Sequence, residues 1–234
     1  MIPDVDVGCI PIQATLLGFS GASISTTGNS IITGKTILYE SASLAVGGTS
    51  QIQGPVFFDV KTGTVSGLAA SQLFPVDLTT EQELLNYVGA ISALSPTQSH
   101  QEINGSMTIR GNGKLNIILV TGDITLNSFQ NLVLEGTAAD VFVINVLGSI
   151  NVGGHASITL NGVLPKNVAF NALGTGAPIS LVAGGVINGT FIGVQRGASV
   201  GGSGVLKGSL YAAQTVNISG GGQAWYPVIF CSNR

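Results

Sequence analysis

The chain contains few charged residues, and this scarcity excludes several functions. Only 8% of its 234 residues are charged, and the formal net charge is -3. Nucleic-acid binding is excluded, because no cluster of basic residues is present to attract phosphate groups. No apolar run reaches the roughly 18 to 20 residues of a membrane span, so we expect no insertion into a membrane.

The sequence also lacks a recognisable secretory signal. The N-terminal segment MIPDVDVGCIPIQATLLGF (1–19) has neither a basic region nor a long apolar core. Either a signal has been removed or the chain never had one, and we expect removal if the chain acts outside the cell.

Cysteine is rare, with Cys9 and Cys231 near opposite ends of the chain. They are either two unrelated thiols or a disulfide, which would close the chain ends or join two subunits in an oxidising compartment.

The residues that carry catalysis are scarce and scattered. His100 and His155 are the only histidines, and no spacing of histidine and cysteine suggests a zinc site. Asp123 and Asp140 occupy matching places in two similar stretches, 121–128 and 138–145, so they either stack or are two solvated carboxylates. No serine lies in a nucleophile-elbow context. We therefore expect no enzyme activity, no metal and no cofactor.

Short alternating segments recur at regular intervals. Glycine accounts for 34 residues, and 44% of the chain is hydrophobic. One set of segments follows a 17-residue register: NGSMTIRG (104–111), TGDITLNS (121–128), AADVFVIN (138–145) and HASITLNG (155–162). Alternate side chains of a strand point to opposite sides. In each stretch, the residues directly before and after Thr108, Thr125, Phe142 or Thr159 should therefore face a core.

A second, slightly longer register is also present. Gly34 recurs as Gly54, and Gly189 recurs as Gly208. Glycine pairs such as Gly201-Gly202 supply the backbone angles that tight corners need. Repeats of this length predict an all-β protein, a β-solenoid with about 17 to 20 residues per coil.

One segment is predicted to be helical. In LTTEQELLNYVGAISALSP (78–96), Thr80 and Glu83 fit a capping box, and the apolar residues recur at helical spacing: Leu84, Val88, Ile91 and Leu94. We expect an amphipathic helix over about 79–94 that lies along the solenoid, inserted between its coils. The predicted organisation is an N-terminal extension or capping strand over 1–17, followed by one discontinuous solenoid domain over 18–234.

The order of these elements resembles a known family. The stretches GASISTTGNSIITGKTILYESASL (21–44), DVFVINVLGSINVGGHASITLNGVLPKNVAFNALG (140–174) and INGTFIGVQRGASVGGSGVLKGSLYA (187–212) resemble the ice-binding-like proteins with a discontinuous β-solenoid. The ending NISGGGQAWYPVIF (217–230) is similar to the related choice-of-anchor A surface-protein domains. The resemblance implies a triangular cross-section, a helix packed alongside, an extracellular location and no catalysis.

A solenoid face presents its outward side chains as a grid, which can match a periodic surface. The alignment of the four similar stretches predicts an outward row of Thr108, Thr125, Phe142 and Thr159, with Ser106 and Ser157 beside it. Threonine and serine rows suit ice, although threonine is also simply favoured in exposed strand positions. The leading hypothesis is a non-catalytic extracellular module that binds ice through this row.

The alternative hypothesis is adhesion or self-assembly. A low-charge surface rich in hydroxyl groups also suits a cell-surface or matrix ligand. The N-terminal strand can pair with a neighbouring subunit to form a homopolymer, or it can cap its own solenoid.

Overall fold

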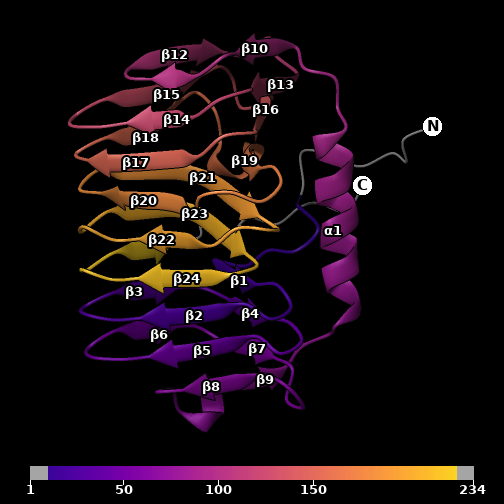
Figure 1. Cartoon of the computed structure of the whole chain (residues 1–234), viewed down its shortest axis with the longest axis vertical. Helices are drawn as coiled ribbons and strands as arrows, with labels where there is room; N and C mark the ends of the chain where they lie inside the picture. Colours follow the sequence, from indigo (N-terminus) through magenta and orange to yellow (C-terminus); the bar gives the residue numbers. More distant parts are fainter. Residues whose placement is uncertain (1–9, 226–234) are drawn as a thin grey trace.

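The structure, a computed structural model, describes residues 10–225 and is a three-sided solenoid (Figure 1). The hydrogen-bonded strand pairs are parallel, and coils contribute short strands to three faces, as in a β-solenoid. The corners between strands are tight turns, many of them built on glycines with positive φ. The all-β solenoid with one helix alongside, predicted from the sequence, is therefore confirmed.

The first face is covered by the helix α1 (Thr79–Ser92) and is called here the helix-covered face. From one end of the stack to the other it consists of β10 (Gln98–His100), β13 (Leu115–Val120), β16 (Val141–Val146), β19 (Val168–Ala172), the second halves of β21 (Val186–Gly193) and β23 (Val205–Ala212), β1 (Leu16–Gly18), β4 (Thr36–Leu38), β7 (Val56–Phe58) and β9 (Leu73–Pro75).

The second face is a separate nine-stranded sheet that no other element of residues 10–225 covers, called here the open face (Figure 1). Its order is β11 (Ile103–Asn104), β14 (Ile124–Leu126), β17 (Ile150–Gly154), β20 (Ile179–Ala183), β22 (Ala198–Val200), β24 (Thr215–Ile218), β2 (Ser23–Thr26), β5 (Ser43–Val46) and β8 (Thr64–Ser66).

The third face completes the coil. It contains β12 (Met107–Arg110), β15 (Asn131–Glu135), β18 (Ser157–Asn161), the first halves of β21 and β23, β25 (Gln223–Trp225), β3 (Ile31–Thr33) and β6 (Gln51–Gln53). Strand β21 bends from the third face to the helix-covered face at Gly189, which has φ +119. A side chain at Gly208 would collide with the carbonyl oxygen of Gly189, so both corner positions require glycine.

The chain does not fill the stack in sequence order. The coils before α1 form one end, α1 runs along the side, and the chain resumes at β10 at the opposite end (Figure 1). The later coils then wind back until β23 pairs with β1 and β24 pairs with β2, in the middle of the stack. Strand β1 begins at Leu16, before the expected domain boundary at 17/18, and it is an internal strand of the solenoid.

The 17-residue register is wrong as a coil repeat. On the third face Met107 pairs with Leu132, which pairs with Ile158, so one coil there runs from 107 to 132 and the next from 132 to 158. A step of 17 residues covers only part of such a coil. Residues 17 positions apart in the four stretches therefore lie on different faces. The second register is confirmed, because Gly189 pairs with Gly208 and Ile32 pairs with Ile52.

The core consists of apolar rows that run along the inside of the stack. Ile124, Ile150 and Ile179 are completely buried neighbours on successive strands of the open face. Complete burial of each such side chain stabilises the fold by about 1.5–3 kcal/mol relative to exposure. Each coil is too thin to bury its own apolar residues, so the coils depend on one another.

A second apolar cluster joins α1 to the solenoid. Leu84, Val88 and Ile91 are buried against the helix-covered face, as the helical spacing predicted, and Leu94 is half-buried. Ile12 also packs into this cluster. Within residues 10–225, no helix has the length and apolar composition needed to cross a membrane.

The start of α1 differs from the predicted capping box. The helix begins at Thr79, and the carboxylate of Asp77 accepts hydrogen bonds from the backbone N–H of Thr79 at 3.0 Å and from its hydroxyl at 2.7 Å. Thr80 lies inside the helix, where its hydroxyl contacts the Asp77 carbonyl oxygen and the hydroxyl of Tyr39. Asp77 already serves the first free N–H group, so Thr80 is not the cap.

Cys9 and Cys231 lie outside the described residues, as do the rest of the segments 1–9 and 226–234. Their pairing and the role of the terminal segments in capping or self-assembly stay predictions.

Candidate functional site

The predicted row of Thr108, Thr125, Phe142 and Thr159 is distributed over three faces. Thr108 and Thr159 lie on the third face, with Val133 between them. Thr125 lies on the open face, and Phe142 is completely buried in the core on β16. The row is wrong because its alignment took the 17-residue register for the length of one coil.

The hydroxyl groups near Thr159 are used within the protein. The side-chain oxygen of Asn131 accepts hydrogen bonds from Ser157 Oγ and from Thr159 Oγ1, both at 3.1 Å. Ser106 Oγ accepts the backbone N–H of Asn131 at 3.1 Å. Ser106 and Ser157 thus flank one asparagine and brace neighbouring coils.

The third face is not chemically uniform. An ion pair joins Arg110 to Glu135 at 3.2 Å, and Lys207 lies over the ring of Trp225 at 6.0 Å from its centroid. A regular surface lattice would meet charges, a large ring and apolar side chains here, so this face is a poor candidate for binding one.

The open face is more uniform, and Val182 of β20 is the large apolar side chain exposed on its described strands. None of its nine strands contains a charged or an aromatic residue. Strand pairing aligns one outward residue from each strand in a continuous row, called here the central row: Asn104, Thr125, Asn151, Ser180, Ser199, Asn217, Ser25, Ala45 and Ser66. All of these side chains except that of Ala45 carry a hydroxyl or an amide group.

The half of the open face that contains β24, β2, β5 and β8 has a second row of hydroxyl groups. It consists of Thr215, Ser23, Ser43 and Thr64, which lie two positions before the central row on the same strands. Strands are spaced about 4.8 Å apart and alternate residues about 6.5–7 Å apart, so the two rows form a rectangular grid. Eight steps between strands give the whole central row a length of about 38 Å.

A hollow interrupts the face in its middle. The connection from β19 to β20 covers 173–178, whereas the connection from β23 to β24 covers only 213–214. Ala177 and Pro178 of the longer connection line a hollow of ≈ 380 Å³ together with Ser149, Ile150, Asn151, Ser180 and Ser199. The flat part of the face is therefore the part beyond it, from β24 to β8.

Charged groups near the open face are held at its edge. Hydrogen bonds from Ser149, including its backbone N–H at 2.7 Å, hold the pKa of Asp123 below its usual value. Arg196 is buried, and its guanidinium donates to the backbone carbonyl groups of Leu147, Gly148, Leu173 and Gly174. Burial lowers the pKa of Arg196, which nearby Asp123 partly offsets.

Asp140 is far from Asp123 in the coil and does not stack on it. It lies buried just before β16, where it accepts hydrogen bonds from Gly113, Asn116 and Thr137. Both carboxylates therefore have local structural partners. Within the described residues, no group of three or more histidine, cysteine, aspartate or glutamate side chains is arranged to hold a metal ion.

The fold is thus a discontinuous three-sided β-solenoid with a helix along one face and a flat, uncharged, hydroxyl-rich face exposed. Solved structures of ice-binding proteins share this fold. The chain matches one from an Antarctic Flavobacteriaceae bacterium with a TM-score of 0.67 and 18% sequence identity, over 100% of this chain and 49% of that protein.

Two further matches cover nearly the whole of both proteins. An antifreeze ice-binding protein from an Arctic yeast gives a TM-score of 0.59 at 15% identity, over 97% of this chain and 95% of the yeast protein. An ice-binding protein domain from Shewanella frigidimarina gives 0.57 at 16% identity, over 93% and 95%. At these identities the likeness establishes the fold.

This chain spans about half the length of the Flavobacteriaceae protein. No protein-family model matches the sequence. No curated protein matches it either. The likeness to choice-of-anchor A domains stays a prediction.

Proposed function

We propose that this chain binds ice crystals through the flat part of the open face, from β24 to β8. The observation that carries the proposal is the uncharged grid formed by the central row and the second hydroxyl row. The fold shared with ice-binding proteins supports the same ligand.

The physical basis is the fixed position of the hydroxyl and amide groups. Their spacing follows from backbone hydrogen bonds between coils, so little conformational entropy is lost when the face meets an ordered surface. A charged side chain would keep its own hydration shell and disturb water ordered in a lattice. The strands of this face contain no such residue.

We also propose that the protein acts outside the cell and has no catalytic role. Ice forms an extended external surface, and its recognition needs a matching face with no reacting group. The local structural roles of Asp123 and Asp140 support this view.

The test is ice-crystal shaping and thermal hysteresis with two matched variants. Ser25→Tyr places a ring in the middle of the flat part of the open face, and we expect it to lower thermal hysteresis several-fold. Thr108→Tyr makes a similar change on the exposed third face, and activity should be unchanged. Equal loss in both variants, or unshaped ice with the wild-type protein, would overturn the proposal.

A further inference from the structure

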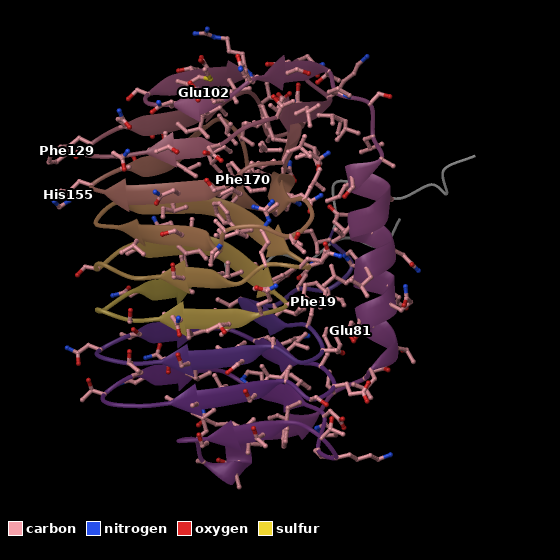
Figure 2. The ribbon with its side chains drawn as sticks, viewed as in Figure 1. Phe19, Glu81, Glu102, Phe129, His155 and Phe170 are labelled. Carbon is pink, nitrogen blue, oxygen red and sulfur yellow. The ribbon has the colours of Figure 1, made fainter. Side chains whose placement is uncertain are left out.

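An exposed aromatic stack projects from the corner between the open face and the third face. Phe129 is 79% exposed, and its ring stacks on that of His155 with centroids 4.9 Å apart and an interplanar angle of 18°. Figure 2 shows both side chains at the edge of the molecule opposite α1. The two rings come from successive coils, so the stack follows the solenoid axis.

The backbone at Phe129 is strained. Ser128 and Phe129 have φ values of +40 and +64, in a tight turn closed by the Gln130 N–H bonding the Asn127 carbonyl oxygen at 3.2 Å. This left-handed region is unfavourable for a bulky side chain. The side-chain oxygen of Gln130 accepts the Asn127 N–H at 2.7 Å and braces the turn.

Two equivalent turns elsewhere in the stack carry small residues at this position. In the turns 201–204 and 219–222 the residues that match Phe129 are Ser203, with φ +64, and Gly221, with φ +81. Packing therefore does not require a phenylalanine at this turn position. A strained conformation that holds a large apolar ring in solvent indicates a function for the ring.

The neighbouring coils are shaped around the stack. A side chain at Gly184 would lie 2.6 Å from Nδ1 of His155, so glycine there leaves room for the imidazole ring. A side chain at Gly154 would lie 2.7 Å from the backbone nitrogen of Ser128, so glycine there lets the two turns approach.

The chemistry around the stack is polar and carries no fixed charge. The turn segments 127–131 and 153–157 include no aspartate, glutamate, lysine or arginine. The surface that two rings expose is also far smaller than the roughly 800 Å² that each partner buries in a stable protein interface. A phosphate, an acidic ligand or a protein partner is therefore disfavoured.

We propose that the Phe129–His155 stack is a saccharide-binding site, distinct from the open face, that takes a pyranose ring of a neutral polysaccharide. The electron-rich face of an aromatic ring attracts the weakly positive C–H groups on one face of a sugar. The surrounding amides and hydroxyls match the polar rim of the same ring. One short stack makes a weak contact. A polymer offers it many equivalent rings at high local concentration, so weak binding can be detected on a polymer.

The test is electrophoresis of the native protein through gels that contain soluble β-1,3-glucan, xylan or glycogen. At least one polymer should retard the wild-type protein. Phe129→Gly should abolish that retardation and still fold, because glycine suits φ +64. Ser203→Gly makes a matched change in an equivalent turn without removing a ring, and it should be retarded like the wild type.

Retardation that persists in Phe129→Gly, or a wild-type protein that none of the three polymers retards, would overturn the proposal. A dimer in analytical ultracentrifugation that disappears in Phe129→Gly would assign the stack to self-association and would also overturn it. Ice shaping should be unchanged in Phe129→Gly, so failure of this proposal is distinguishable from failure of ice binding.

Discussion

Ser25 Oγ donates a hydrogen bond to Oδ1 of Asn217 over 2.7 Å, although the two residues are 192 positions apart in the chain. The contact lies where β2, from the coils before α1, pairs with β24, which is the last strand of the open face in chain order but lies inside the sheet. The central row is thus continuous across the point where the chain order breaks. One flat surface is built from two distant parts of the sequence.

The first prediction concerns charge on this surface. Asn217→Asp preserves the shape of the side chain and the acceptor for Ser25, but it places a carboxylate in the central row. We expect ice shaping to be lost at pH 7 and to return near pH 2, because an aspartate has an ordinary pKa of about 3.9 and the hydrogen bond from Ser25 lowers it. Thermal hysteresis of both proteins at the two pH values measures this, with the wild type as control. Full activity of the variant at pH 7 would contradict it.

The second prediction concerns Arg196, which ties together the corners of successive coils. Arg196→Met keeps much of the buried side-chain volume but leaves four backbone carbonyl groups without their donor. We expect a loss of at least about 3 kcal/mol in the free energy of unfolding, measured by urea denaturation. Lys114→Met, which changes an exposed cation, should have little effect. Similar free energies of unfolding for the two variants would show that the hydrogen bonds of Arg196 do not stabilise the stack of coils.

The sequence predicted the solenoid because the alternation of inward and outward residues is local. In the shorter coils the register was also correct, since Gly189 and Gly208 pair directly on successive coils. Alternation does not say which face a strand joins. The connections at one corner range from the short 213–214 to the much longer 173–178. A fixed number of residues therefore does not always lead back to the same face.

The site was mispredicted for the same reason. Thr125 belongs to the central row, but its neighbours there are Asn104 and Asn151, which lie at unequal distances from it along the sequence. A similar pattern does recur in SIST (23–26), SLAV (43–46) and TVNI (215–218), where a small or polar residue lies between two inward positions. That signal can identify part of the row. The pattern does not predict the order of the coils, because that order depends on α1, which connects one end of the stack to the other.

The third prediction concerns the attachment of α1. Asn145 donates its amide to the carbonyl oxygen of Ile91 at 2.9 Å and accepts from the amide of Asn171 at 2.9 Å. It thereby serves a carbonyl group in the last turn of the helix, which lacks a partner within the helix. Asn145→Ala should lower the free energy of unfolding by about 2 kcal/mol, since buried polar groups lose their partner.

Hydrogen exchange gives a local readout of the same change. The amides of α1 should exchange faster in Asn145→Ala than in the wild type, while those of the open face change less. Asn86→Ala, at an exposed position of the same helix, removes only a solvent-exposed hydrogen bond from Gln82, so it is the control and should change both far less. Uniformly faster exchange throughout the protein would indicate global destabilisation without a specific role in holding the helix.

The last prediction concerns the dependence of stability on pH through Asp140. Burial raises the pKa of this carboxyl group, but hydrogen bonds from the Thr137 N–H, the Asn116 amide and the Gly113 N–H outweigh that effect and hold the pKa at about 2. Because the pKa in the folded state lies below the unfolded value of about 3.9, ionised Asp140 stabilises the fold fully above that value. This stabilisation is lost as the pH falls towards about 2.

Asp140→Asn removes the charge and turns an amide N–H group towards these donors. The variant should therefore be less stable than the wild type at pH 7, and the difference should shrink between about pH 4 and pH 2. Urea denaturation of both proteins at pH 7, 4, 3 and 2 measures the difference directly. Glu102→Gln, at an exposed position, should show almost none at any pH. A difference between wild type and Asp140→Asn that stays constant with pH would mean that packing, and not ionisation, accounts for the contribution of Asp140.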